Sequence, residues 1–434
     1  MRILLGLTEV SGHYGSLKQG FRELGVEATF WNLSGHPFAY GNEDNPFLVR
    51  WIRRVGSKQK QSGNGATRQF WAVLQALLRC VLFLWALFKF DVFIFGFNTS
   101  FLRHFDLPVL KLFGKKIIYQ FHGSDSRPPY LDGSLFPDGA AFPIESCIAQ
   151  TRIKKRILQI IGRYADAIID NPTGAHFHER PIIIWLYVGL TSPASQAAAT
   201  SSLEGSASGP VRILHCPSNP AAKGTALIEQ AINRLKARGH VLELVKISGR
   251  PNAEVLRELQ KCDFVVDQAY SDYAMPGFAT EAAWFGKPVI IGGYSSALWR
   301  ALMPEYQLPP SIFCPPDQLE AEIERMIVDR RHRIETGARV RRFVQTHWQP
   351  REVARRYLQL VEDKIPPSWV FDPSETSYVY GCCAPDSWIR ELIRRVVQTS
   401  GAGALMVSDK PDLERQLLAF GNNEGGQRSE TAAA

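Results

Sequence analysis

Residues Asp272–Ile290 have the sequence DYAMPGFATEAAWFGKPVI, which indicates the fold class. It reads as a polar loop, a Pro-Gly break, a short helix and then a strand, the alternation that builds parallel sheets. Glu281 stands in the apolar first turns of this helix. Because the unpaired N–H groups of a helix N-terminus favour anions, the site suits a phosphate, and Glu281 could bind a ribose diol. The alternative is a carboxylate that complements the helix dipole.

A second stretch, His215–Ile232, has the sequence HCPSNPAAKGTALIEQAI. Lys223 lies in a loop after a predicted strand, and Gly224 opens a helix. A lysine beside a helix N-terminus suits a phosphate, although a lysine near a turn is also an ordinary surface feature. Both stretches follow strands of one predicted domain, and ligands gather at the carboxyl ends of such strands.

Alternating strands and helices lie on both sides of residues 191–210, a segment rich in Ala, Ser and Gly with a single charged residue. This pattern predicts α/β domains with parallel sheets. We expect a Rossmann-like domain over 1–190, a flexible linker over 191–210 and a second Rossmann-like domain over 211–345. A crossover helix and a C-terminal helical extension over 346–420 precede a disordered tail over 421–434.

Cysteine usage and the first residues bear on the compartment. The chain of 434 residues has seven cysteines and ten histidines, with no CxxC pair and no metal-ligand spacing. This favours a reducing compartment and predicts no metal site. Cys382 and Cys383 are interpreted as packing thiols. The opening MRILLGL lacks the pattern of a signal peptide, so we expect a cytoplasmic protein.

The net charge of +8 is unevenly distributed. Residues 1–190 have 22 Lys and Arg against 14 Asp and Glu, whereas residues 191–434 have 28 of each kind. A basic first half suggests an anionic partner, either a membrane surface, a nucleic acid or a phosphorylated substrate. An ordinary solvated surface is the alternative. The basic residues do not follow a recognisable nucleic-acid-binding module, so we expect no nucleic acid.

The segment Phe70–Phe90 is long and apolar enough to span a bilayer. It contains Gln75 and Arg79, and an arginine in the middle of a span costs a few kcal/mol. We therefore favour a buried or interfacial helix over a span. The basic, tryptophan-containing stretch Arg50–Lys60 lies just upstream, and together residues 50–90 fit contact with an anionic membrane. A core helix with a basic loop is the alternative.

The sequence resembles the retaining GT-B glycosyltransferases of family 4. Three stretches carry the resemblance: HCPSNPAAKGT, VLRELQKCDFVVDQ and PGFATEAAWFGKPVI. The resemblance covers residues 211–360 well and the first domain more loosely. It implies a GT-B fold, in which two Rossmann-like domains face each other across a cleft. It places Lys223 at the diphosphate of a nucleotide-sugar donor and Glu281 at its ribose, with Ser218 also at the donor site. The backbone of Gly277, Phe278 and Ala279 would approach the phosphates.

In the first domain, the loop TEVSGHYGSL matches the family at Gly12, where the backbone comes close to the diphosphate. The stretch YQFHGSDSRPP places His122 at the end of a strand, where the family has a histidine facing the transferred sugar. Asp125 and Arg127 could contact donor or acceptor, or pair with each other. By this resemblance His122, Lys223 and Glu281 are the catalytic candidates.

The sequence also departs from the family pattern. The family has two glutamates near the last motif, and Tyr273 stands where the first would be, with Asp272 beside it. Both are candidates for contact with the sugar or the acceptor. The arginine that often precedes the lysine is missing. No DxD motif is present, and we expect the diphosphate to be stabilised by cations and helix N-termini without a metal or a permanent cofactor.

The prediction is a glycosyltransferase that moves a sugar from a nucleotide-sugar to a glycan or lipid-linked glycan, in bacterial surface polysaccharide synthesis by resemblance. It would work in the cytoplasm, as a peripheral protein at the inner face of the cell membrane. The alternatives are a GT-B nucleotide-sugar epimerase and a catalytically degenerate GT-B binding or scaffold protein.

Overall fold

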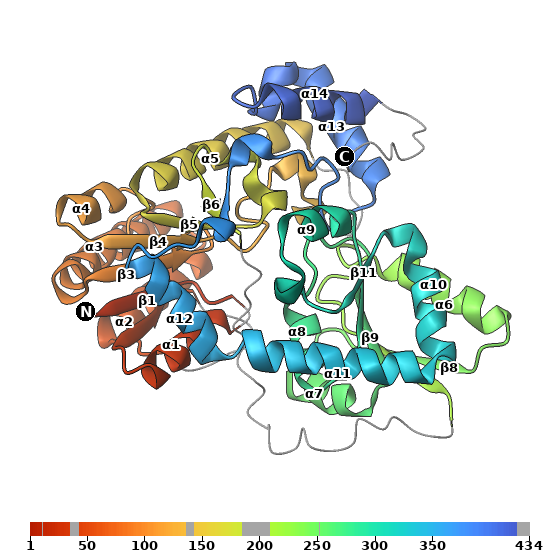
Figure 1. The fold of residues 1–434 in the computed structure, drawn as a ribbon. Helices are drawn as coiled ribbons and strands as arrows, with labels where there is room; N and C mark the ends of the chain where they lie inside the picture. The colour runs from red at the N-terminus through yellow and green to blue at the C-terminus, as the bar shows by residue number, and fades with distance from the viewer. Residues whose placement is uncertain (11, 35–42, 136–142, 185–208, 251, 423–434) are drawn as a thin grey trace.

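The computed structural model describes the chain except for residues 11, 35–42, 136–142, 185–208, 251 and 423–434 (Figure 1). Most of the predicted linker 191–210 and the part of the predicted tail from residue 423 therefore lie outside the described residues. Residues 421 and 422, predicted as tail, belong to the last helix.

Two sheets organise the molecule. The first has the strand order β12-β6-β5-β4-β3-β1-β2 and the second has the order β11-β10-β9-β7-β8. All strand pairs are parallel except β12 with β6. The strands are β1 (Ile3–Leu7), β2 (Ala28–Asn32), β3 (Val92–Gly96), β4 (Lys116–Gln120), β5 (Ala167–Ile169), β6 (Ile182–Ile183), β7 (Val211–His215), β8 (Leu242–Lys246), β9 (Phe264–Gln268), β10 (Val289–Gly292), β11 (Ile312–Cys314) and β12 (Val370–Phe371).

The helices connect these strands and cover both faces of each sheet. They are α1 (His13–Glu23), α2 (Phe47–Gln61), α3 (Gly65–Lys89), α4 (Leu107–Leu112), α5 (Ile144–Tyr164), α6 (Thr225–Ala237), α7 (Asn252–Lys261), α8 (Gly277–Trp284), α9 (Ser296–Leu302), α10 (Leu319–Val328), α11 (Arg330–His347), α12 (Pro350–Val361), α13 (Asp386–Ser400) and α14 (Pro411–Asn422).

Strand β1 shows why the central strands are continuous apolar runs. Its five residues are all buried, and alternate side chains enter different cores. Ile3 and Leu5 pack with residues of α1 and α12, whereas Leu4 packs in the cluster that contains the inner face of α3. Successive side chains of a strand point to opposite faces, so a sheet covered by helices on both sides needs apolar residues at every position.

The second domain repeats this plan. Ile213 and Val266 pack with residues of α6 and α10 on one face. Leu214 and Val265 face the other side, in the cluster that also contains Ala279 of α8. The carboxyl ends of both sheets point toward the space between the domains (Figure 1).

After α11 the chain returns to the first domain. Helix α12 packs against α1, and Gly20 of α1 lies so close to the carbonyl of Pro350 that an added Cβ would be 2.0 Å from its oxygen. The C-terminal extension, Pro366–Asn422, then adds β12 to the edge of the first sheet and packs α13 against α5. Two Rossmann-like domains with parallel sheets, facing across a cleft and joined by a returning helix, confirm the predicted GT-B fold class with its C-terminal helical extension.

Candidate active site

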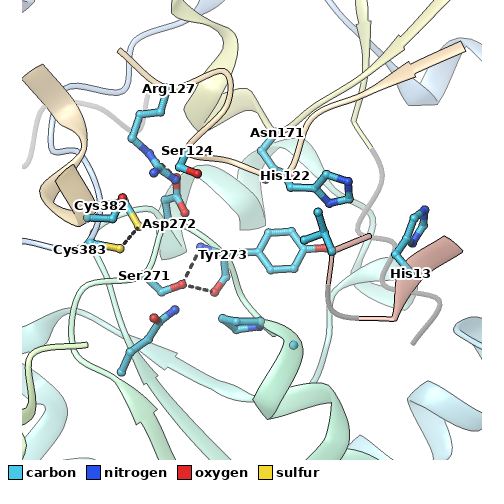
Figure 2. Close-up of a pocket in the computed structure, with 15 residues that line it drawn as sticks. His13, His122, Ser124, Arg127, Asn171, Ser271, Asp272, Tyr273, Cys382 and Cys383 are labelled. Carbon is cyan, nitrogen blue, oxygen red and sulfur yellow. Dashed lines mark hydrogen bonds and ion pairs between the residues drawn. The ribbon is translucent and has the colours of Figure 1, made fainter. Parts of the chain in front are cut away.

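A cleft of about 310 Å³ lies between the two domains, at the carboxyl ends of their strands (Figure 2). The first domain contributes loops that follow β1, β4 and β5, and the second contributes loops that follow β9. The extension closes one wall. The described residues that line the cleft are Val10, His13, His122, Ser124, Arg127, Ser134, Asn171, Gln268, Ser271, Asp272, Tyr273, Pro276, Gly277, Cys382 and Cys383.

His122 follows β4 and reaches the cleft, where the sequence predicts it. Its ring lies 5.6 Å from the ring of His13, and its Nε2 atom is buried with no hydrogen-bond partner among the described residues. Burial, together with the neighbouring His13, lowers the pKa of His122 to about 3. Burial likewise lowers the pKa of His13 to about 4. Both imidazoles are therefore neutral near pH 7, and each can exchange hydrogen bonds with a hydroxyl group without bringing a positive charge.

Asp125 shapes the loop that carries His122. Its Oδ1 accepts a hydrogen bond from the backbone N–H of His122 at 2.7 Å, and the side chain is buried. Burial and the nearby Asp170 raise the pKa of Asp125 to about 7. Lys154 of α5 holds the same loop, because its ammonium group donates to the carbonyl oxygens of Ser124 and Arg127, each at 2.7 Å. Asp125 thus positions the loop, and it is not among the residues that line the cleft.

Arg127 pairs across the cleft with Asp272. Its Nε donates to Asp272 Oδ2 at 3.0 Å and its Nη2 also contacts that oxygen, while Nη1 lies 3.5 Å from Asp132 Oδ1. The side chains of Arg127 and Asp272 are 4% and 7% exposed, so the pair is desolvated and joins the two domains. A pair between Arg127 and Asp125 was one possibility from the sequence. In the structure, the carboxylate partners of Arg127 are Asp272 and Asp132 instead.

Tyr273 lies beside this pair in a loop that several hydrogen bonds hold. Ser271 Oγ donates to the carbonyl of Tyr273 at 2.8 Å and accepts from its N–H at 3.0 Å. The indole N–H of Trp299 donates to the carbonyl of Asp272 at 2.9 Å. The ring of Tyr273 projects toward the side of the cleft where His122 lies (Figure 2). A phenol therefore occupies the space between the domains at the position where the family pattern has a glutamate.

The N-terminus of α8 opens into the cleft. Pro276 and Gly277 line it, the helix has no side-chain cap, and its first turn has no acidic residue. The N–H of Thr280 is satisfied by the carbonyl of Pro276. Phe278 is half-buried and Ala279 is buried. Backbone donors at an uncapped N-terminus are suited to bind an anion.

Lys223 follows β7 and Glu281 belongs to α8, and neither is among the described residues that line the cleft. Lys223 Nζ contacts Asp267 Oδ1 at 2.9 Å. Asp267, Glu281 and Lys223 all act electrostatically on the thiol of Cys216, whose pKa rises to about 11, chiefly through burial. Lys223 and Glu281 are therefore both near enough to Cys216 to influence its thiol, and the lysine already has a carboxylate partner. Ser218 is exposed.

Gly12 has a structural explanation of its own. It caps α1 with φ 79°, a left-handed conformation that favours glycine. The carboxylate of Glu9 accepts the N–H groups of Val10, Tyr14 and Gly15 at 2.9 to 3.2 Å, so an internal anion already occupies donors at the N-terminus of α1. Burial nevertheless raises the pKa of Glu9 to about 7.

The extension builds one wall of the cleft, which the sequence did not predict. Cys382 and Cys383, interpreted as packing thiols, line the cleft with their sulfur atoms 3.4 Å apart. Their backbone bridges the domains: the carbonyl of Cys382 accepts from Gly133 N–H, and the N–H of Cys383 donates to the carbonyl of Tyr270 at 2.7 Å. No local pattern signals such a role, because it depends on pairing between distant segments.

Asn171 and Gln268 are two further lining residues that the sequence analysis did not name. Each follows or ends a strand, β5 and β9 respectively, and the carboxyl ends of parallel strands are where ligands gather. Applied to every strand, that rule would have found them. Among the described residues, no group of three or more His, Cys, Asp and Glu side chains could hold a metal ion.

Comparison with known proteins gives similarities of overall structure alone. No protein-family model and no curated protein matches the chain. HepE from Anabaena, solved with UDP and glucose, is 13% identical with a TM-score of 0.49, covering 83% of this chain and 99% of that one. The glycosyltransferase SnogD from Streptomyces nogalater is 15% identical with a TM-score of 0.34 and covers the same shares. A UDP-GlcNAc 2-epimerase from Methanocaldococcus jannaschii, solved with UDP-GlcNAc and UDP, is 11% identical with a TM-score of 0.35, covering 80% and 98%. The fold class follows from the strand orders and the returning helix, independently of these similarities.

Proposed function

We propose that the protein is a glycosyltransferase that binds a nucleotide-sugar in the cleft between its domains and transfers the sugar to a glycan or lipid-linked glycan. One observation carries the proposal: the uncapped N-terminus of α8 and the neutral His122 line a single cleft from opposite domains. The N-terminus of a helix can bind the phosphates of a nucleotide-sugar, and a neutral imidazole can bind the hydroxyl groups of its sugar.

The donor phosphates would lie at the backbone of Gly277, Phe278 and Ala279, next to Lys223. Asp267 accepts one of the three N–H donors of the Lys223 ammonium group, which leaves the others for phosphate oxygens. These groups would stabilise the leaving diphosphate without a metal ion. Glu281 would bind the ribose, with Ser218 at the edge of the donor site.

His122 would hydrogen-bond the transferred sugar from the first domain, and Gly12 belongs to the loop on that side. Asp125 would act by holding the His122 loop. Asp272 and Tyr273 would border the sugar or the acceptor, with Asp272 held in place by Arg127. Retention of the anomeric configuration and membership of family 4 are inferred from the motif resemblance.

The acceptor side of the cleft belongs to the first, basic domain. A basic domain fits an acceptor at an anionic membrane surface. The cytoplasmic role in the synthesis of a bacterial surface polysaccharide, at the inner face of the membrane, is inferred from the motif resemblance. An epimerase that uses the same donor is the second candidate, since Glu9 and Asp125, with pKa values raised to about 7, are carboxyls near the cleft that could exchange protons at neutral pH.

The first experiment is a thermal-shift screen against UDP, GDP, dTDP and ADP, with wild type and Glu281→Ala. A nucleotide at a hundred times its Kd stabilises the folded state by about 2.7 kcal/mol. We expect one nucleotide to raise the Tm of wild type and to raise that of Glu281→Ala much less. Glu322→Ala, which removes a half-buried glutamate of α10 in the same domain, is the matched control and should respond like wild type.

Product analysis then separates the candidates. With the identified donor and an acceptor extract, a transferase releases nucleoside diphosphate and forms a glycoside, whose anomeric configuration NMR reports. An epimerase converts the donor into its epimer without release. If no nucleotide shifts wild type at millimolar concentration, the donor-binding proposal is wrong, and a degenerate scaffold remains.

A further inference from the structure

The helix α3 exposes a continuous apolar face. Seven large apolar side chains along it are between 41% and 69% exposed, at intervals of one to four residues, mostly three or four. That spacing places them along one side of a helix. This outer stripe consists of Phe70, Val73, Leu77, Val81, Leu84, Trp85 and Phe88. Single exposed apolar residues are normal on proteins, but a contiguous patch marks a binding surface.

The opposite face of α3 belongs to the core of the first domain. Leu82, Phe83 and Ala86 are buried there. Arg79 is partly buried, and the charges of Arg103 and Asp106 act on it. By length and composition α3 is the one helix among the described residues that could cross a membrane. Its most apolar stretch of 18 residues has a mean hydropathy of 1.9, and 28% of that stretch is buried. Because the inner face is packed against the sheet, the stripe can lie on a lipid surface while the domain stays folded.

The apolar surface continues beyond α3. The ring of Phe113 lies 6.2 Å from that of Phe88, and the neighbouring Leu112 is 82% exposed. Phe105, just before α4, is 79% exposed. None of these exposed residues is among those that line the cleft between the domains. The patch is therefore separate from the cleft.

Basic residues border the stripe. Residues 47–89 contain eight Lys and Arg and no Asp or Glu. Arg50, Arg54 and Lys60 are exposed on α2, which packs along α3. Lys89 Nζ lies 5.0 Å from the ring centre of Trp85 at the end of the stripe. Apolar and aromatic side chains within a basic border are the features of an element that lies in the headgroup region of an anionic membrane.

We infer that the outer stripe docks the protein on an anionic lipid surface, with Phe105, Leu112 and Phe113 extending the contact. The charge distribution favours lipid over a second copy of the chain. A symmetric dimer through this face would bring two basic borders together with no acidic residue of α2 or α3 to offset them.

The direction of α3 relates this surface to the cleft. The helix leads directly into β3, so its last residue lies at the amino edge of the sheet and its first residues lie toward the carboxyl edge. At 1.5 Å per residue, its 25 residues extend about 37 Å, far longer than β3. A membrane along the stripe therefore reaches the level of the cleft. If the proposed glycosyl transfer holds, the acceptor is an amphiphile whose anchor stays in that membrane.

The test is co-sedimentation of the full chain with vesicles of phosphatidylcholine alone or mixed with phosphatidylglycerol. We expect wild type to sediment with the anionic vesicles and to remain in solution with the neutral ones. The triple variant Leu77→Glu, Val81→Glu, Leu84→Glu should bind at least tenfold less. The matched control, Val241→Glu with Val328→Glu, changes exposed valines of the second domain and should bind like wild type.

A second variant protects the test against misfolding. Arg50→Gln, Arg54→Gln and Lys60→Gln change only exposed cations, and we expect several-fold weaker binding at low salt. Equal binding by wild type and the triple variant, or no binding of wild type to anionic vesicles, overturns the inference. So does a dimer in solution that the triple variant dissociates.

The outcome is independent of donor binding. The triple variant should keep the nucleotide-dependent thermal shift of wild type, and it should lose transfer to a membrane-anchored acceptor while keeping transfer to a water-soluble analogue. If vesicles bind and no nucleotide does, docking stands and the proposed glycosyl transfer fails. If both acceptors are used equally by wild type and the triple variant, the assignment of a lipid-anchored acceptor fails.

Discussion

Asp125 is a buried carboxyl whose charge the folded protein disfavours, and this has a measurable consequence for stability. Burial raises its pKa from 3.8 to about 7, so the folded state holds the proton more tightly than the unfolded chain. The stability that this group contributes is therefore lost as pH rises from about 4 to about 7. Asp125→Asn should avoid the loss and exceed wild type by up to about 4 kcal/mol at pH 8. Urea denaturation at pH 4, 6 and 8 checks the trend.

The control for this prediction is Asp91→Asn. The backbone N–H of Arg2 lowers the pKa of Asp91, so its replacement should destabilise the protein at neutral pH and matter less as the pH falls. If Asp125→Asn is less stable than wild type at pH 8, the carboxyl is ionised and well paired in the folded state.

At the scale of elements, the contact between α1 and α12 rests on the absence of a side chain. A Cβ on Gly20 would lie 2.0 Å from the carbonyl oxygen of Pro350 and 2.8 Å from Cβ of Ala354. Gly20→Ala should therefore push the helices apart and cost about 3 kcal/mol. Gly162→Ala in α5 meets no atom within 4 Å and should stabilise by about 0.5–1 kcal/mol. Chemical denaturation of both variants tests the contact, and equal effects would count against it.

The elements show which parts of the fold the sequence could predict. β1, β3 and β4 are apolar runs between polar loops, so the signal for each strand is local in the sequence. β12 has only Val370 and Phe371, and it is a strand because it pairs with Ile182 and Ile183, far away in the sequence. No local pattern contains that information.

Some residues of the candidate site could likewise be predicted from local sequence, and others could not. His122 and Gly277 follow or precede regular elements in recognisable motifs, and the sequence placed both at the cleft. The Arg127–Asp272 pair and the wall of Cys382 and Cys383 depend on how three separate parts of the chain meet. Lys223 was expected at the ligand, but its pairing with Asp267 needed the geometry of two adjacent strands.

At the scale of the molecule, an aromatic stack couples the second domain to the extension. The rings of Tyr294 and Tyr380 lie 5.1 Å apart, and Tyr294 Oη accepts the N–H of Asp386 at 3.1 Å. Tyr294→Ala should weaken this coupling by about 1.4 kcal/mol. The wall would then open locally about ten times more often, so Cys382 and Cys383 should be alkylated about tenfold faster. Mass spectrometry after treatment with N-ethylmaleimide measures the rate, with the exposed Cys80 as internal reference.

Tyr306→Ala is the matched control for the stack, because Tyr306 belongs to the same domain and is 64% exposed. Its rate of alkylation at Cys382 and Cys383 should equal that of wild type. An unchanged rate in Tyr294→Ala would show that the hydrogen bonds from Gly133 and to Tyr270 hold the wall without the stack.

The return of the chain to its first domain also sets the order of events during translation. Residues 211–345 form their sheet from one continuous stretch, whereas the first sheet needs Val370–Phe371 and its covering helices need α12 and α13. At 5–20 residues per second, roughly 10 to 40 s separate the synthesis of β6 from that of α13. During this time the apolar faces of α1 and α5 stay uncovered, because α12 and α13, which pack on them, have not yet been synthesised. The first domain is synthesised before the second, but it cannot complete its packing until the C-terminal helices have been made. We therefore expect a chaperone to bind the exposed apolar faces of the nascent first domain.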